Sequence, residues 1–310
     1  MVQAFSSPID PHVFLAGRPP IAEFISFVKK SGDDSQRNGE EAIDASLAQE
    51  WRKANDHLRL LEASEAGWAD SPPIGALPPG LHTYAELLRA DPAFRQTHGF
   101  VPTEISIVEL DRLVVFQKHI NLTQVEIIKQ ELGSNPGPEV IARIALGLSR
   151  YSPPVRLIQT HDVFTFTCDS RDFRFLEPIL LAPEHAPTGF RGVPARCVAL
   201  AVGFSPNCLS AIQAERRLIL VNGSHRAYAL RELGITHVPC VIQKTSRPEE
   251  IELIGQKEIS QRSELYLKNP RPPLLKDYFD ARLRRIVPVA RARRLIRIQL
   301  RIDQSDVPTV

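Results

Sequence analysis

The sequence predicts an α+β (or α/β) fold, a mixed sheet with helices, and three observations lead to this prediction. Segments with the alternating or β-branched pattern of strands occur repeatedly between residues 103 and 243. Segments whose apolar residues recur at helical spacing lie among them. Apolar residues make up 43% of the 310 residues, which is enough to build a buried core.

The first of three regions, residues 1–102, is expected to consist of helices and loops. PPIAEFISFVKK opens with prolines, which suit a first helical turn, and a second helix is expected from Glu40 to about Ala66. The polar stretch KSGDDSQRNGEE between them predicts a loop. After the Pro-rich break DSPPIGALPPG, the segment TYAELLRADPAF predicts a short helix.

The second region, residues 103–245, is expected to alternate strands and helices. Its predicted strands are TEISIVEL, ARCVALAVGF and RRLILV, together with a hairpin and a flanking strand in PVRLIQTHDVFTFTCDSRDFRFLEPILL. Its predicted helices are GPEVIARIALGLSR and NLTQVEIIKQELG, the second with an Asn or Thr cap and a terminal Gly.

The third region, residues 246–310, is expected to be a charged helix followed by an Arg-rich arm, residues 270–310. Eight arginines and no acidic residue lie between residues 281 and 302, and a Pro-rich segment precedes them. The Pro-rich segment favours an arm that pairs with a protein partner or a second protomer. Nucleic acid is the less favoured partner, because no aromatic residues for base stacking alternate with these arginines.

Composition excludes several classes of protein. No run of eighteen apolar residues is present and the N-terminus lacks the pattern of a secretory signal, so we expect a cytoplasmic protein without a membrane partner. Cys168, Cys197, Cys208 and Cys240 form no CxxC pair and have no histidine at zinc-ligand spacing. Reduced, mostly buried thiols are therefore expected.

The most informative stretch is LILVNGSHRAYALRELGITHVPCVIQ, residues 218–243, in which a strand pattern gives way to a helix at Asn222–Arg226. Gly223 permits a positive φ and a close approach to the backbone. The first N–H groups of a helix have no internal partner and favour phosphate. His225 and Arg226 are cations in an unfavourable place unless an anion is near. The alternative is a structural turn with Arg226 in an ion pair.

This stretch resembles the signature of the ParB/sulfiredoxin superfamily: a strand, a Gly-x-x-Arg turn, an Ala-rich helix, a Leu-Gly and a Val-Pro strand. The matching residues are Gly223, Arg226, Ala227, Ala229, Leu233, Gly234, Val238 and Pro239. Residues 103–132 are similar to the opening half of that domain. The resemblance implies that about 134–195 is an insertion in a ParB/sulfiredoxin-like mixed sheet.

The resemblance also limits the reactions that this chain is expected to catalyse. Sulfiredoxins carry a catalytic cysteine where this chain has Ser224, so sulfinic-acid reduction is excluded. Partition-type members bind CTP and add a helix-turn-helix, which the sequence after Gln243 does not indicate. Kinase members use ATP or ADP and a carboxylate in the opening segment. The matching loop here offers Asp111 and no carboxylate close to the helix.

The principal hypothesis is a nucleotide-binding protein that takes ATP or CTP with Mg²⁺ and acts by phosphoryl transfer or nucleotide hydrolysis. Ser224 and His225 are the candidate catalytic residues. The candidate nucleotide-binding residues are Asn222, Gly223, Ser224, His225 and Arg226, with Gln117, Lys118 and His119 from the opening segment. The alternative is a catalytically inactive binding or regulatory module that uses its basic arm.

Overall fold

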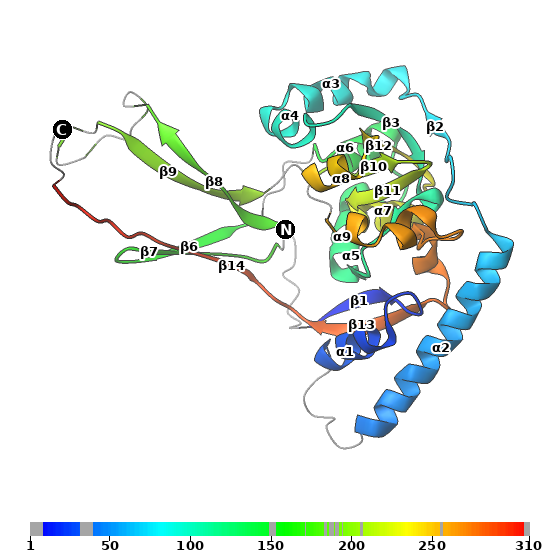
Figure 1. The fold of residues 1–310 in the computed structure, drawn as a ribbon. Helices are drawn as coiled ribbons and strands as arrows, with labels where there is room; N and C mark the ends of the chain where they lie inside the picture. Colours follow the sequence, from blue (N-terminus) through cyan, green and yellow to red (C-terminus); the bar gives the residue numbers. More distant parts are fainter. Residues whose placement is uncertain are drawn as a thin grey trace. The chain divides into compact units, whose positions relative to one another are not determined.

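The computed structural model describes residues 9–31, 40–148, 153–170, 172–182, 185, 189, 192–193, 195–204, 207–254 and 257–306 (Figure 1). The chain divides into two compact units. Unit 1 comprises Met1–Ser149 and Pro206–Arg291, and unit 2 comprises Arg150–Ser205 and Ala292–Val310. The fold class is α+β with mixed sheets, as the sequence predicts.

Unit 1 is built on a six-stranded mixed sheet. Its order is β2 (Ile74–Gly75), β3 (Thr103–Glu109), β12 (His237–Thr245), β10 (Ser210–Ala214), β11 (Arg217–Asn222) and β4 (Val114–Val115). The β10–β12 and β11–β4 pairs are parallel, and the other pairs are antiparallel. The predicted strands over 103–110, 216–221 and 237–243 are thereby confirmed, while the sequence analysis did not identify β10.

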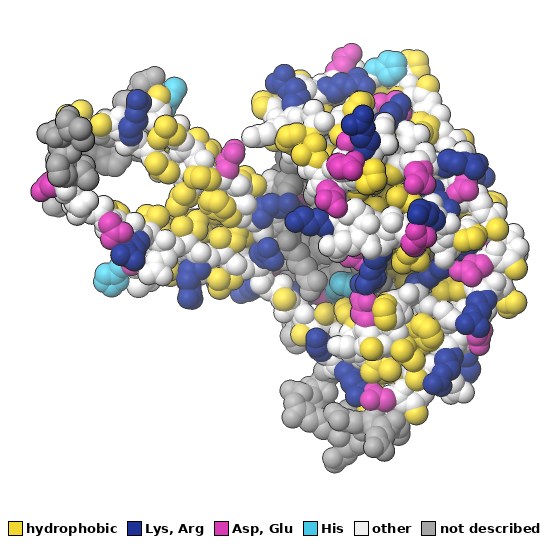
Figure 2. All heavy atoms as spheres, in the orientation of Figure 1, with side chains coloured by type: hydrophobic (Ala, Val, Ile, Leu, Met, Phe, Trp, Pro, Cys, Tyr) yellow, Lys and Arg dark blue, Asp and Glu magenta, His cyan; other side chains and the backbone are white. Residues whose placement is uncertain are grey.

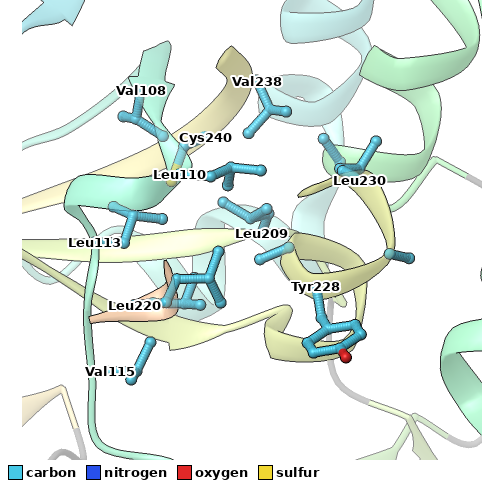
Figure 3. Packing of buried hydrophobic residues seen from close by; sticks show 14 of the residues in the cluster. Val108, Leu110, Leu113, Val115, Leu209, Leu220, Tyr228, Leu230, Val238 and Cys240 are labelled. Carbon is cyan, nitrogen blue, oxygen red and sulfur yellow. The ribbon is translucent and has the colours of Figure 1, made fainter. Parts of the chain in front are cut away.

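Helices α5 (Leu122–Leu132), α6 (Pro138–Ala145) and α7 (Ser224–Glu232) form the main core with this sheet. Asn121 caps α5, since its Oδ1 accepts the N–H groups of Thr123 and Gln124 at 2.8 and 3.3 Å, and Gly133 follows the last turn. Figure 3 shows side chains of the strands meeting Tyr228 and Leu230 of α7. The strand–helix joint before α7 therefore adjoins the main buried core of unit 1.

A second, three-stranded sheet in unit 1 joins segments that are far apart in sequence. Strand β1 (Ile9–Leu15) lies between β13 (Arg284–Ala290) and β5 (His119–Asn121), and both pairs are antiparallel. The expectation of only helices and loops over residues 1–102 is wrong at β1 and at the two-residue strand β2. The segment IDPHVFL begins with a polar and Pro-containing pattern and becomes a strand because distant strands pair with both of its edges.

The N-terminal helices are α1 (Ile21–Ser31), α2 (Glu40–Ser64), α3 (His82–Ala90) and α4 (Pro92–His98), and a 3₁₀ turn, Pro79–Leu81, precedes α3. Helices α1 and α2 pack with β1 and β13 around Phe14 and Phe24. The single short helix expected over residues 83–94 is two helices. Asp91 is extended and caps α4 ahead of Pro92, which prevents the two from being continuous. Of the loop expected between α1 and α2, residues 32–39 lie outside the described residues.

The region after β12 corrects two further expectations. In place of one long helix, the described residues form α8 (Pro248–Leu253), α9 (Lys257–Gln261) and a π-helical turn, Glu264–Lys268. The Pro-rich segment that follows is not an arm. Its 3₁₀ helix, Leu275–Phe279, is inserted into the core because Leu274, Leu275 and Tyr278 are buried. The basic stretch is also divided, since β13 belongs to unit 1 and β14 (Arg294–Gln299) to unit 2.

Unit 2 contains two small antiparallel sheets. One has the order β14, β7 (Val163–Cys168) and β6 (Val155–Thr160), and the other pairs β8 (Phe173–Leu181) with β9 (Cys197–Phe204). The predicted hairpin is confirmed as β6–β7, with His161 and Asp162 at its turn, and β8 is the flanking strand. The apolar pattern of ARCVALAVGF correctly predicts β9.

Candidate functional site

The turn between β11 and α7 requires glycine at its second residue. Gly223 has φ +86°, and a Cβ built on it would lie 2.8 Å from Leu209 Cα. Both facts exclude a side chain, because L-residues rarely adopt this conformation and the neighbouring backbone occupies the space. The Gly223 N–H donates to Asn222 Oδ1 at 2.8 Å, which fixes the start of the turn. The predicted close approach of backbone at Gly223 therefore involves the chain's own Leu209.

Helix α7 begins at this turn without a side-chain cap. Its first intrahelical bond is donated by the Ala227 N–H to Gly223 O at 2.8 Å. Three N–H groups precede this bond, those of Ser224, His225 and Arg226. At these positions a helix offers no carbonyl acceptor of its own. The N-cap residue is Gly223, which has no side chain to cap the helix, and Ser224 is buried. The end of the helix is thus formed by backbone donors, as phosphate-binding turns require.

The side chain of His225 is held at the start of α5. The backbone N–H of Asn121 donates to His225 Nε2 at 3.1 Å, so Nε2 is the acceptor in this contact. Asn121 caps α5 and anchors α7 in one place.

Arg226 projects from the first turn of α7 toward a neutral partner. Its Nη1 donates to Asn207 Oδ1 at 2.5 Å, and its side chain is half-buried. This contact holds the guanidinium without neutralising its charge, since an amide oxygen carries no net charge.

A group of polar residues that the sequence analysis missed lies next to this turn. His12, on β1, is buried and places its Nδ1 2.9 Å from Nδ1 of His119. Asp10, also on β1 and buried, accepts from Asn121 Nδ2 at 3.1 Å and from Arg291 Nη2 at 2.7 Å. Both residues were missed because β1 was not recognised; the signal available was their alternation in IDPHVFL.

The pKa of the Asp10 carboxyl lies below its ordinary value. Burial acts in the opposite direction and is the largest single influence, but hydrogen bonds from Arg291, Asn121 and Thr123 together exceed it. Asp10 is thus a carboxylate that is already bonded on both oxygens. Asn121 links it to His225.

The structure brings His119 to this group but directs Gln117 and Lys118 elsewhere. Lys118 Nζ contacts Glu23 and lies 3.8 Å from Glu258 Oε1. Gln117 O accepts from the Tyr278 hydroxyl, and the residues Gln117 and Lys118 help to line a cavity of about 30 Å³. Asp111, in the opening loop, pairs with Arg231 at 2.7 Å at the other end of α7.

The expected burial of the cysteines is confirmed for three of the four. All four are free thiols, and Cys168, Cys208 and Cys240 are buried. Burial raises the pKa of Cys208 to about 11 and that of Cys240 well above its usual value. Within the described ranges, no three His, Cys, Asp or Glu side chains are placed to hold a metal ion.

The chain matches no protein-family model, no curated protein and no solved structure. Among the helices that the structure describes, none combines the length and apolar composition needed to cross a membrane.

Proposed function

We propose that this chain is a nucleotide-binding protein of the ParB/sulfiredoxin type and that residues 222–226 hold the nucleotide's phosphates. The observation that carries the proposal is the start of α7. Gly223 is held in the left-handed region against Leu209, and the helix that follows has no side-chain cap. Backbone donors at such a helix end suit a phosphate.

The arrangement of the two family halves supports the same proposal. Strands β11 and β4 are parallel neighbours in the six-stranded sheet, and the helices that follow them, α7 and α5, lie against each other. Asn121, at the start of α5, meets His225, at the start of α7. The Gly-x-x-Arg turn and the opening segment thereby meet at the helix ends, where the resemblance implies a shared ligand site.

In the proposed complex, the N–H groups of residues 224–226 would bind phosphate oxygens and Arg226 would neutralise part of their charge. His225 would stay beside the phosphate site, since the Asn121 N–H donates to its Nε2. The ligand class is a nucleoside di- or triphosphate, with ATP and CTP as the two candidates that the resemblance implies.

We further propose that the chain binds its nucleotide without rapid turnover, which favours a regulatory module over a phosphotransferase. A general base must accept a proton readily near neutral pH. Asp10, the carboxylate linked to the turn through Asn121, has a lowered pKa and is held by Arg291. Ser224 is buried, which disfavours it as a nucleophile.

The described side chains around the turn do not fit a magnesium site held by the protein. Mg²⁺ prefers carboxylate and phosphate oxygens. Near the turn, the described groups are the imidazole of His225, the guanidinium of Arg226 and the amides of Asn121, Asn207 and Asn222, while the carboxylate of Asp10 is already bonded by Asn121 and Arg291. We therefore derive no step through the ion, and any Mg²⁺ would be bound by the nucleotide's own phosphates.

A thermal-unfolding series tests the binding proposal. The protein would be heated with ATP, ADP, CTP or GTP, with and without Mg²⁺, beside the variants Arg226→Ala and Arg89→Ala. A ligand at 100 times its Kd adds about 2.7 kcal/mol to the free energy of unfolding. We expect one nucleotide to raise the melting temperature of the parent protein and of Arg89→Ala, which removes an exposed arginine on α3.

The Arg226→Ala variant should lose most of that shift while melting, without ligand, close to the parent protein. A well-folded parent protein whose melting temperature no nucleotide changes would contradict the proposed site. Release of phosphate at a rate typical of enzymes, about 1 s⁻¹ or more, would instead show that the module is a catalyst.

A further inference from the structure

The three-stranded sheet of unit 2 has one apolar and one polar face. Directly paired residues of antiparallel strands share a face. The register places Leu157, Phe166 and Ile296 in one row. With the rows on either side, this apolar face carries six apolar side chains, Val155, Leu157, Phe164, Phe166, Ile296 and Ile298, together with Cys168 and, near its ends, Gln159 and Arg294. The opposite face is more polar and has Arg156, Ile158, Thr160, Val163, Thr165, Thr167, Leu295, Arg297 and Gln299.

The second sheet of unit 2 is apolar along most of its length. The β8–β9 ladder pairs Phe175 with Val202, Pro178 with Leu200, and Leu180 with Val198. Large parts of these side chains face solvent, including 66% of Leu180 and 68% of Val198. Figure 2 shows hydrophobic side chains gathered over β8 and β9.

The exposed apolar area of unit 2 is large for a free surface. Five of its large apolar residues, on the apolar face and on the face of the β8–β9 ladder that carries Leu180, are at least 40% exposed, namely Val155, Leu157, Phe175, Leu180 and Val198. Together with their half-buried neighbours, these residues expose on the order of 800 Å² of apolar surface. This value multiplies each exposed fraction by about 150–200 Å², the full area of a large side chain. The largest apolar patch on a typical monomer is about 300–600 Å².

The size and chemistry of this surface define what would cover it. About 800 Å² is the area that each partner buries in a standard interface. The apolar face carries one charged residue in its register, Arg294 at its end, so a polyanion or an acidic peptide finds a single matching charge there. An apolar sheet face is matched by another such face at about 10 Å spacing, as in a β-sandwich. A second copy of the chain provides an apolar face of the same area.

We propose that two copies of this chain associate through unit 2, with the apolar face of the β14–β7–β6 sheet and the exposed β8–β9 ladder forming the interface. The arrangement is isologous, so each residue of the surface is buried in both copies. The interface uses β14 from the basic segment, while β13 already pairs with β1 inside unit 1. The proposal does not depend on nucleotide binding at residues 222–226.

Adjacent residues on opposite faces of β6 provide a matched pair of variants. Leu157 lies on the apolar face and is 54% exposed, whereas Ile158 lies on the polar face and is 62% exposed. The molecular mass of the full chain would be measured by sedimentation velocity over a dilution series, for the parent protein, Leu157→Asp and Ile158→Asp. We expect dimers for the parent protein and Ile158→Asp. We expect association to be weakened roughly 100-fold or more in Leu157→Asp, because the carboxylate is buried twice across the two-fold axis.

A measurement on the parent protein alone keeps the proposal testable if Leu157→Asp fails to fold. The fluorescence of a dye that binds exposed apolar surface should rise per chain on dilution, as dimers separate. The proposal would be overturned if the parent chain stayed monomeric at a protein concentration of about 100 μM, which is roughly 100 times a typical micromolar Kd. Equal dissociation by both variants would also overturn it, as would a monomer that binds phospholipid vesicles through this face.

Discussion

Replacement of Arg271 by methionine perturbs the buried ion pair that anchors residues 269–279 in unit 1. The guanidinium donates to both oxygens of Asp277, at 2.5 and 2.6 Å, and to Glu65 Oε2 at 3.0 Å. Arg271 is 1% exposed and Asp277 is 2% exposed, so water does not replace the lost contacts. The pKa of Arg271 is raised, because its hydrogen bonds and attraction to Asp277 and Glu65 together exceed the opposing effect of burial, the largest single influence.

The expected loss of stability depends on the contacts that Asp277 and Glu65 keep when Arg271 is replaced. Asp277 keeps its hydrogen bond from the Leu274 N–H, at 2.9 Å, and the weaker attraction of Arg18, and removing one member of a buried pair costs about 3–5 kcal/mol. Glu65 is more exposed and keeps Lys276 at 2.9 Å, so its contribution is at most about 1 kcal/mol. We therefore expect Arg271→Met to lower the free energy of unfolding by about 3–5 kcal/mol.

Urea unfolding followed by tryptophan fluorescence provides the measurement, since Trp51 and Trp68 both belong to unit 1. The control is Arg262→Met, whose exposed pair with Glu258 spans 3.8 Å and should contribute less than about 1 kcal/mol. The double variant Arg271→Met with Asp277→Leu should recover much of the loss, because no unpaired charge stays buried. A cost below about 1 kcal/mol for Arg271→Met would refute the reasoning.

Three other outcomes are expected. Gly223→Ala should destabilise unit 1 by roughly 2–4 kcal/mol in the same urea experiment, since left-handed strain of about 1–2 kcal/mol adds to the contact with Leu209; an unchanged midpoint would contradict the described turn. The lowered pKa of Asp10 stabilises the folded protein. This stabilisation is complete above the pKa of an unfolded Asp, near 3.9, and it is lost as the pH falls through the lower pKa of Asp10 in the folded protein. Acid unfolding of Asp10→Asn should lack that component, and an identical acid profile would argue against it. Because burial raises the pKa of Cys208 to about 11, an alkylating reagent at pH 7 should modify this thiol only when the protein unfolds, as peptide mass analysis would show; rapid labelling of the folded protein would count against its burial.

The elements that the sequence predicts well are those whose signals are local. The hairpin β6–β7 combines β-branched residues with a His161–Asp162 turn. The joint at Gly223 is predicted because a strand pattern, a glycine and a helix follow one another within a few residues. At the candidate site, the same local signal identifies Gly223 and Arg226. Their partners, Leu209 and Asn207, come from a different segment and carry no such signal.

The features that the sequence analysis missed depend on contacts between distant segments. Asp10 and His12 reach the candidate site only because β1 pairs with β5 and β13. Arg271, in a segment whose prolines indicate a linker, is buried because Glu65 and Asp277 meet it there. Propensity and spacing describe neither the pairing of remote strands nor the neutralisation of a charge by a remote carboxylate.

The pairing of β1 with β13 has a consequence for the order in which the protein assembles. A ribosome makes β1 long before β13, because most of the sequence separates them. Contacts so distant form late and slow the overall folding rate. During synthesis, β1 has β5 as its only neighbour in this sheet, and one edge stays open until β13 emerges. That open edge makes the incomplete chain a substrate for chaperones or for aggregation, and closure of this sheet marks the completion of unit 1.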